Sequence, residues 1–279
     1  MSKLAITLSF IFLSLLFKPG FAQNSQNELD RVIFKTVDDS VSLSIYFTYP
    51  NSYNKQDQWP LIVFFHGGGW NQGSYKHFLR QAKYFSNHGF ICALPEYRVR
   101  KKHNSTPFES LKDAKSALRF LKVNANKFQI DTSKVIAAGG SAGGHLAASL
   151  EMVEGYNEPT DDLGVDTDVD ALVLFNGVLD NGPSGYGFRR VGKEYTSFSP
   201  FHQTKKGTAP TLILLGTDDN LIPVESMQEY CSEMKSAGSI CKLVLYEGQE
   251  HGFFNRSPYL EKTIQQMHEF LIELELTKS

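Results

Sequence analysis

Apolar positions recur with two different periods along this chain, and the two periods predict an alternation of strands and helices. Short apolar runs predict strands at residues 31–37, 41–49, 61–65, 90–94, 134–138, 169–175, 211–215 and 242–246. Apolar positions at helical spacing predict helices at residues 75–87, 107–121, 142–153, 224–236 and 258–275. An alternation of this length predicts one α/β domain with a mostly parallel central sheet and helices on both faces.

Local signals agree with this pattern. The run at 61–65 (LIVFF) has no polar interruption, which is typical of a strand buried on both faces. Thr106 and Glu109 fit a capping box, and Pro107 occupies the first position of the helix that follows.

Two longer segments interrupt the alternation. Residues 177–209 are rich in Gly, Ser, Pro and aromatic residues, and loops of this length inside a compact domain are usually functional. We expect this segment to form a lid or an excursion that faces substrate. Residues 157–168 are rich in Asp, and we expect a solvated surface loop. No repeat, linker or break in composition marks a second domain, so a single domain is expected over 23–279.

The N-terminal residues 1–22 have the pattern of a secretory signal peptide. Lys3 precedes an apolar stretch at 4–17, and Gly20 and Ala22 place small residues at −3 and −1 of a cleavage after Ala22. The stretch is shorter than the roughly 20 residues that a membrane-spanning helix needs, although an uncleaved anchor is the alternative. We expect a secreted or periplasmic protein with no membrane association once the segment is removed.

Charge and cysteine content narrow the class of protein. Lys and Arg number 28 against 30 Asp and Glu, a formal net charge of −2, which provides no basic field for nucleic acid. Cys231 and Cys241 fall on a predicted helix and at the start of the next strand, so a disulfide and two free thiols are both open. Cys92 lies in an apolar run and is expected to be buried and unreactive. No spacing of His and Cys suggests a metal site, and no cofactor is expected.

Ser141 has the sequence context of a catalytic nucleophile. The motif GGSAGG at 139–144 follows one predicted strand and leads into a predicted helix, as a G-x-S-x-G nucleophile elbow requires. Glycines on both sides allow the close backbone approach that leaves the Ser141 hydroxyl exposed near a helix N-terminus. A glycine-rich turn with a serine helix cap is the alternative interpretation.

The motif HGGGW at 66–70 has the pattern of an oxyanion loop, because it directly follows the buried strand at 61–65. The backbone N–H groups of Gly68 and Gly69, together with that of Ala142, are expected to bind developing negative charge. His66 is expected to anchor the loop by hydrogen bonding. A merely flexible glycine turn is the alternative.

His251 is the candidate general base, because it alone among the eight histidines follows a predicted C-terminal core strand. The carboxylate that orients it is expected in the turn after 211–215, and the residues alone leave Asp218 and Asp219 as alternatives. Such a carboxylate fixes the imidazole tautomer and stabilises the imidazolium. The chain order Ser, Asp, His is that of α/β-hydrolases.

Five stretches agree in this interpretation: HGGGW at 66–70, PEYR at 95–98, GGSAGGHLA at 139–147, GTDDNLIP at 216–223 and EGQEHGFF at 247–254. With them the chain, from about 31 to 275, resembles α/β-hydrolase-fold esterases of the hormone-sensitive-lipase-like group, particularly secreted bacterial acetyl esterases acting on carbohydrates. In that family the acid is the fourth residue of the G-x-x-D turn, so the resemblance selects Asp219. It also supports Ser141 as nucleophile and His251 as base. The family's large N-terminal cap is absent, which weakens any inference of bulky lipid substrates.

These observations lead to the hypothesis of a secreted serine carboxylesterase that removes small acyl groups, acetyl in first place, from a sugar or polysaccharide. Candidate residues of the acyl or sugar site are Trp70, Tyr186, Phe188, Phe253 and Phe254, each with core packing as its alternative. A feruloyl-type esterase or a serine peptidase would use the same triad. A non-catalytic carbohydrate-binding protein on the same scaffold is the alternative outside enzymes. The sequence indicates no oligomeric state.

Overall fold

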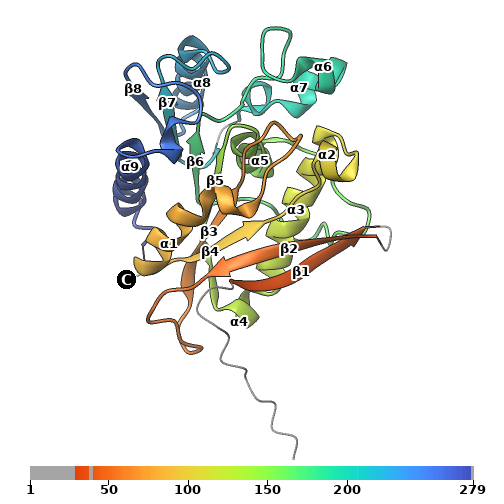
Figure 1. Cartoon of the computed structure of the whole chain (residues 1–279), viewed down its shortest axis with the longest axis vertical. Coiled ribbons are helices and arrows are strands. Elements are labelled where there is room, and N and C mark those ends of the chain that lie inside the picture. The colour runs from red at the N-terminus through yellow and green to blue at the C-terminus, as the bar shows by residue number, and fades with distance from the viewer. Residues whose placement is uncertain (1–28, 38–39, 206, 278–279) are drawn as a thin grey trace, which may run out of the picture.

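Eight strands form one sheet in the order β1-β2-β4-β3-β5-β6-β7-β8 (Figure 1). The structure is a computed structural model and describes residues 29–37, 40–205 and 207–277, so the predicted signal peptide lies outside the described residues. β1 and β2 are antiparallel to each other, β2 is antiparallel to β4, and every other neighbouring pair is parallel. The carboxyl ends of the parallel strands therefore lie along one edge, where parallel α/β sheets place their binding sites.

The strands are β1 (Asp30–Val37), β2 (Val41–Thr48), β3 (Trp59–Phe65), β4 (Ile91–Pro95), β5 (Ile130–Gly140), β6 (Ala171–Phe175), β7 (Thr211–Gly216) and β8 (Cys241–Tyr246). The longer helices are α1 (Leu79–Asn87), α3 (Pro107–Val123), α5 (Ala142–Met152), α8 (Val224–Ser236) and α9 (Tyr259–Glu273). The short helical segments are η1 (Tyr75–Phe78), α2 (Arg100–His103), α4 (Ala125–Phe128), α6 (Phe188–Val191), η2 (Gly192–Glu194), α7 (Tyr195–Phe198), η3 (Pro200–Gln203) and η4 (Phe253–Asn255).

Each predicted strand and helix is present, and the fold prediction is confirmed. The capping box of α3 forms as predicted, with Thr106 and Glu109 bonded reciprocally. Two details differ. The first turn of the helix predicted over 75–87 is the 3₁₀ helix η1, and the segment 177–209 contains four short helices in place of a continuous irregular loop.

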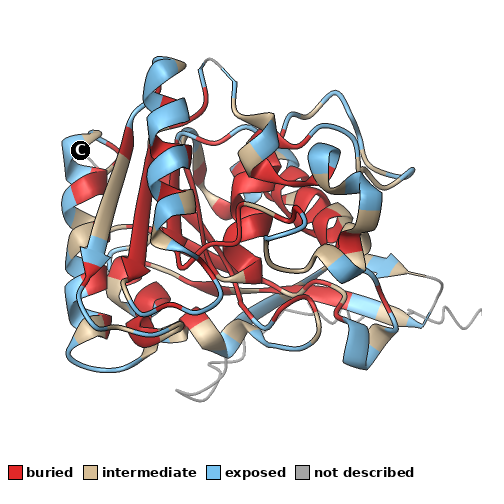
Figure 2. Cartoon of the chain, turned by 90° about the horizontal axis from the view of Figure 1, so that it is seen from above, coloured by how far each residue is buried: buried red, intermediate tan, exposed pale blue. Residues whose placement is uncertain are grey.

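Helices cover both faces of the sheet. One apolar core packs α3, α5 and α8 against the sheet, and a second packs α1 and α9 against the opposite face. Figure 2 shows the central strands buried over most of their length, whereas the peripheral helices are exposed on their outer sides. Within the described ranges, no helix is long and apolar enough to cross a membrane.

The Asp-rich loop 157–168 is mostly exposed, as predicted, but it also makes ion pairs that its composition did not indicate. Glu158 lies 3.1 Å from the Lys35 ammonium and also pairs with Arg98. Both cations contact the fully buried carboxylate of Asp113, at 2.6 and 2.8 Å. The pairs form because the loop returns across α3, a long-range contact that local composition does not encode.

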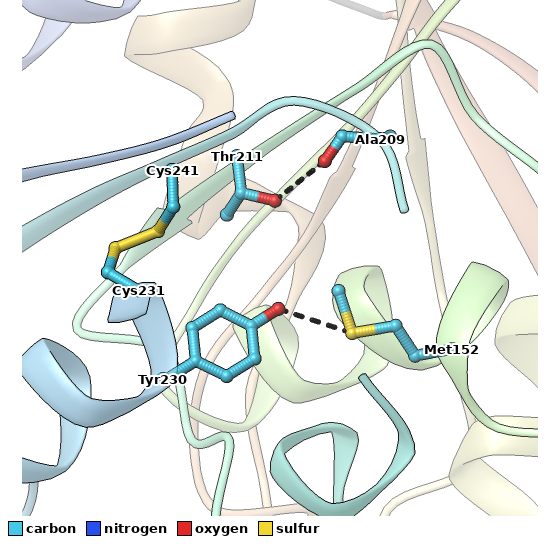
Figure 3. The surroundings of a disulfide bond; sticks show 6 residues. All are labelled: Met152, Ala209, Thr211, Tyr230, Cys231 and Cys241. Atoms are coloured by element: carbon cyan, nitrogen blue, oxygen red, sulfur yellow. Dashed lines mark hydrogen bonds between the residues drawn. A yellow bond between two sulfur atoms is a disulfide. The ribbon is translucent and has the colours of Figure 1, made fainter. Parts of the chain in front are cut away.

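A disulfide joins Cys231 of α8 to Cys241 at the start of β8, with 5.2 Å between the Cα atoms (Figure 3). This resolves the alternative left by the cysteine pattern. The neighbouring Tyr230 hydroxyl contacts the Met152 sulfur on α5, so the bridge sits against the core. Cys92 is fully buried in β4, as predicted.

Candidate active site

Ser141 lies at the sharp turn between β5 and α5, at the carboxyl edge of the sheet. Its backbone has φ 55° and ψ −121°, a conformation that costs energy for any residue with a Cβ atom. The turn is held by hydrogen bonds from Ser141 N to Phe175 O and from Val178 N to Ser141 O. At Gly143 a Cβ atom would lie 2.1 Å from the carbonyl oxygen of Phe65, so only glycine permits α5 to approach β3 this closely.

A hydrogen-bonded chain connects three side chains from three separate loops. His251 Nε2 lies 2.9 Å from Ser141 Oγ, and His251 Nδ1 lies 2.7 Å from Asp219 Oδ2. Ser141 follows β5, Asp219 follows β7 and His251 follows β8, so parallel strands bring together residues up to 110 positions apart. The Asp218 side chain is exposed, and among the described residues its one hydrogen bond comes from the Thr217 hydroxyl, so the geometry agrees with Asp219 as the orienting acid.

The carboxylate of Asp219 is fully buried and accepts four hydrogen bonds. Oδ1 accepts the backbone N–H groups of Leu221 and Ile222, and Oδ2 accepts the bonds from His251 and Asn176. Burial alone would raise the pKa of this carboxyl, but the bonds from His251 and the backbone outweigh burial and hold the pKa below its usual value. The group is therefore a fixed negative charge next to the imidazole.

Asn176 is a site residue that sequence reasoning missed. It directly follows β6, is fully buried, and donates from Nδ2 to Asp219 Oδ2 at 2.6 Å. Its φ of 49° is a conformation that asparagine tolerates better than most residues. The available signal was an Asn placed immediately after the apolar run 171–175, at the same sheet edge as Ser141.

Three backbone N–H groups near Ser141 have no acceptor in the part of the chain that the structure describes. Among the described residues, the N–H groups of Gly68, Gly69 and Ala142 donate to no other group. Gly68 has φ 116°, and a Cβ atom there would lie 2.0 Å from the Gln72 carbonyl oxygen. Unpaired backbone donors beside a serine hydroxyl are the arrangement that an oxyanion requires.

Hydrogen bonds and a ring contact from neighbouring side chains fix the position of the glycine loop. The Gly67 N–H donates to His77 Nδ1 at 3.1 Å, and the Tyr97 hydroxyl donates to the His66 carbonyl at 2.6 Å. His66 itself is buried, bonds to the Gly67 carbonyl and stacks on Tyr97, so it has the anchoring role predicted for it. Burial lowers the pKa of His66 to about 4, which keeps this imidazole neutral near pH 7.

Arg190 on α6 is a second contact that the sequence did not reveal. Its Nη1 donates to the Gly69 carbonyl, and its guanidinium lies 5.0 Å from the Trp70 ring and 5.4 Å from the Tyr186 ring. The segment 177–209 therefore contacts the glycine loop directly through the Arg190 cation and the Tyr186 ring.

The aromatic candidates separate into three environments. Trp70 is buried under Arg190 and against His145, and the Tyr186 hydroxyl lies close to Gly69. Phe188 lines an open cleft of about 490 Å³ together with Tyr186, Asn220 and Leu221. Phe253 lines a separate cleft with His251, and Phe254 packs in the core against Phe78 and Phe175. The structure thus groups Trp70, Tyr186 and Phe188 around Arg190 and leaves Phe254 in a packing role. No group of three or more His, Cys, Asp or Glu residues in the described part of the chain is arranged to bind a metal ion.

An eight-stranded, mostly parallel sheet with a serine at the elbow after β5 defines this chain as an α/β-hydrolase. Residues 44–181 match the protein family described as BD-FAE. The apo structure of Thermogutta terrifontis esterase 2 superposes with a TM-score of 0.86 at 36% identity, covering 92% of this chain and 98% of that one.

Curated relatives agree. Esterase LipC of Mycobacterium tuberculosis is 29% identical over 219 residues, which cover 70% of this chain and 53% of LipC. The acetylxylan esterase of Xylanibacter ruminicola is 26% identical over 199 residues, which cover 69% of this chain and 40% of that protein. The chain thus spans about half the length of such relatives, or less. It belongs to the α/β-hydrolase-fold esterases of the hormone-sensitive-lipase-like group.

Proposed function

We propose that the protein is a secreted serine carboxylesterase that hydrolyses small acyl esters of carbohydrates, acetyl esters in first place. The observation that carries the proposal is the continuous hydrogen-bonded chain from Asp219 through His251 to Ser141. Its geometry matches the requirements for nucleophilic attack by a serine with a histidine base.

In the proposed reaction, Ser141 Oγ attacks the ester carbonyl carbon while His251 Nε2 takes the hydroxyl proton. The carbonyl oxygen becomes an oxyanion that accepts hydrogen bonds from the N–H groups of Gly68, Gly69 and Ala142. Collapse of the tetrahedral intermediate breaks the bond to the alcohol oxygen, and His251 donates its proton to that oxygen. Asp219 keeps the tautomer with Nδ1–H and stabilises the imidazolium.

Deacylation uses the same groups. Water replaces the departed alcohol, His251 removes one of its protons, and the water oxygen attacks the acyl-serine carbonyl. The second tetrahedral intermediate collapses to the free acid, and His251 returns the proton to Ser141 Oγ. Every proton is thus transferred by His251, so the reaction needs no other acid or base.

The Tyr186 hydroxyl beside the glycine loop favours short acyl groups. A Cβ atom on Gly69 would already lie 2.6 Å from the Tyr186 hydroxyl, so little space is open on that side of the loop. Thermogutta terrifontis esterase 2 has been solved with propionate and with butyrate bound. The acetylxylan esterase relative supports a carbohydrate as the alcohol.

The test is hydrolysis of p-nitrophenyl acetate by the purified protein and by Ser141→Ala. We expect a loss of about 10⁴-fold or more in kcat, as for other removed triad serines. Ser236→Ala, which removes an exposed hydroxyl at the end of α8, is the matched control and should keep the wild-type rate. Equal rates for the wild type and Ser141→Ala would instead support a non-catalytic protein.

A substrate panel then separates the alternatives within enzymes. Release of acetate from acetylated xylan, pectin and free sugar acetates is compared with hydrolysis of methyl ferulate and of aminoacyl p-nitroanilides. The proposal expects the highest kcat/KM for an acetylated carbohydrate. A higher value for methyl ferulate or for an anilide would transfer the assignment to a feruloyl esterase or a peptidase.

Secretion is the remaining part of the proposal, and it rests on the pattern of residues 1–22. Expression of the full chain in a bacterium, followed by mass spectrometry of the exported protein, should give a mature chain that begins at Gln23. Retention of the apolar segment at 4–17 in the membrane fraction would contradict this part and support an anchor.

A further inference from the structure

A pocket of about 260 Å³ is lined by Trp70 at the end of the glycine loop, and it shares no lining residue with the cleft that His251 lines. Its walls come from three parts of the chain that are distant in sequence: the end of the glycine loop, the stretch 100–107 and α6. Trp70 ends the glycine loop, Arg100 begins α2, Ser105 precedes α3, and Arg190 belongs to α6. Nothing in the proposed reaction uses this pocket.

The charge of the pocket is one-sided. Two of its lining residues, Arg100 and Arg190, are cationic, and none of its lining residues is acidic. The guanidinium of Arg100 is exposed and, within the described part of the chain, makes no hydrogen bond or ion pair. The chain as a whole carries a formal net charge of −2, so this positive pocket is local and does not reflect composition.

Two of the residues that line the pocket also carry unpaired polar atoms. The Ser105 hydroxyl and Trp70 Nε1 are both buried and have no hydrogen-bond partner among the described residues. Buried polar groups are nearly always bonded in proteins, and an unbonded group indicates a missing partner. These two donors belong to residues that line the same pocket as the two arginines, a combination that suits a partner rich in acceptor oxygens.

We propose that this pocket binds a carboxylate carried on the substrate, as in an ester of a uronic-acid-containing carbohydrate. The proposal rests on the proposed esterase function and names the substrate class of that site. Guanidinium groups recognise carboxylates through paired, charge-assisted hydrogen bonds. The volume is below the roughly 300–1,000 Å³ of sites for drug-sized ligands, so it suits one acidic sugar unit.

The pocket is coupled to the proposed oxyanion loop through shared residues. Arg190 lines the pocket and donates to the Gly69 carbonyl, while Trp70 lines it one residue further along the chain. The pocket and the proposed oxyanion loop therefore share Trp70 and Arg190 as neighbours of Gly69. A sugar bearing both groups could be held at the carboxylate while its acyl ester reaches Ser141.

Binding is tested without turnover in the Ser141→Ala protein. The probes are methyl glucuronide and the uncharged methyl glucoside, followed by tryptophan fluorescence, because Trp70 is one of only two tryptophans in the chain and lines the pocket. We expect a saturable change with the glucuronide that weakens as salt is added, and none with the glucoside. An equal response to both sugars, or no saturable response to the glucuronide, would overturn the proposal.

Two matched variants locate the binding. Arg100→Gln removes a lining charge, whereas Lys102→Gln removes an equal charge from the same helix at a residue that does not line the pocket. Loss of one hydrogen-bonded charge pair should raise the glucuronide Kd about tenfold or more in Arg100→Gln. The Kd of Lys102→Gln should stay within about twofold of the parent, because a screened surface charge contributes little. Equal weakening by the two variants would reduce the effect to general surface charge and overturn the assignment.

Competition by sodium acetate in the same titration distinguishes a site for a carboxylate on the substrate from a site for the released acid. If acetate competes with the glucuronide at similar concentration, the pocket is a site for the released acid and the substrate assignment is wrong.

The activity arm compares kcat/KM for an acetylated methyl glucuronide and an acetylated methyl glucoside. We expect the wild type to favour the charged ester and Arg100→Gln to lose about tenfold of that preference. No preference in the wild type would contradict the proposal. Failure of the esterase function itself would be visible separately, as equal rates for the wild type and Ser141→Ala, while the titration still decides whether the carboxylate binds.

Discussion

Replacing Asp219 with Asn changes one acceptor into a donor at the most constrained point of the site. The Asn oxygen can keep the bonds from the backbone N–H groups of Leu221 and Ile222. Its NH₂ group then faces the Asn176 amide donor and His251 Nδ1, where the native carboxylate accepted both. To avoid two opposed donors, His251 must release the proton from Nδ1 and carry it on Nε2. The imidazole then donates from Nε2 to Ser141 Oγ, and its one lone pair lies on Nδ1, where it cannot accept the hydroxyl proton.

The magnitude follows from that tautomer change. The analogous Asp→Asn change in a serine protease lowers kcat about 10⁴-fold with the geometry intact. At about 1.36 kcal/mol for each factor of ten, this corresponds to about 5.4 kcal/mol of lost transition-state stabilisation. We expect a loss of this order in Asp219→Asn, with a much smaller effect on KM because the acyl site is untouched.

The assay is steady-state hydrolysis of p-nitrophenyl acetate, with a melting curve to show that each variant is folded. Asp218→Asn is the matched control, because Asp218 is exposed and one position away, and it should keep kcat within about twofold. The reasoning is refuted if folded Asp219→Asn retains more than a tenth of wild-type kcat, or if Asp218→Asn is the more damaging of the two.

Three further outcomes are expected from the same structure. Arg190→Gln removes the donor to the Gly69 carbonyl and should lower kcat for p-nitrophenyl acetate about tenfold. The exposed control Arg189→Gln should change kcat little. An equal loss in both variants would contradict the role given to Arg190. Burial raises the pKa of Glu151 from 4.5 to about 7, so the folded protein keeps a proton that the unfolded chain releases above about pH 4.5. The free energy of unfolding of the wild type should therefore decrease as the pH rises from about 4.5 to about 7. Glu151→Gln should therefore raise Tm at pH 8 and leave it nearly unchanged at pH 4, and a uniform shift at both pH values would argue against titration. Cys231→Ser opens a loop with a sequence separation of 10 and should lower the free energy of unfolding by about 2–3 kcal/mol in urea titrations, whereas a stability unaffected by reductant in the wild type would contradict the bridge.

The parts of the site that sequence reasoning predicted are those that each follow an apolar strand. Ser141, Asp219 and His251 come after β5, β7 and β8, and parallel strands align their carboxyl ends regardless of the distance along the chain. The choice between Asp218 and Asp219 needed the family resemblance, because two adjacent carboxylates in one turn have the same local pattern.

The residues that were missed act through tertiary contacts. Asn176 is important because it reaches Asp219 across two neighbouring strands, and a single Asn after an apolar run is not distinctive. Arg190 lies in a segment whose position depends on packing against Trp70 and Tyr186, which no periodicity encodes. The pairing of Glu158 with Lys35 and Arg98 failed to be predicted for the same reason, since the three lie far apart in sequence.

The disulfide between α8 and β8 indicates where the chain can accept an inserted segment. Asp219 precedes α8 and His251 follows β8, so one covalently closed helix–strand unit carries both partners of the imidazole hydrogen bond. The short connection between Ser236 and Cys241 lies at the far end of that unit from the sheet edge that holds Ser141. A fused domain or an immobilisation tag inserted there would lie beside the disulfide and away from the sheet edge that holds Asp219 and His251. We expect that connection to be the most permissive internal insertion point in the C-terminal third of the chain.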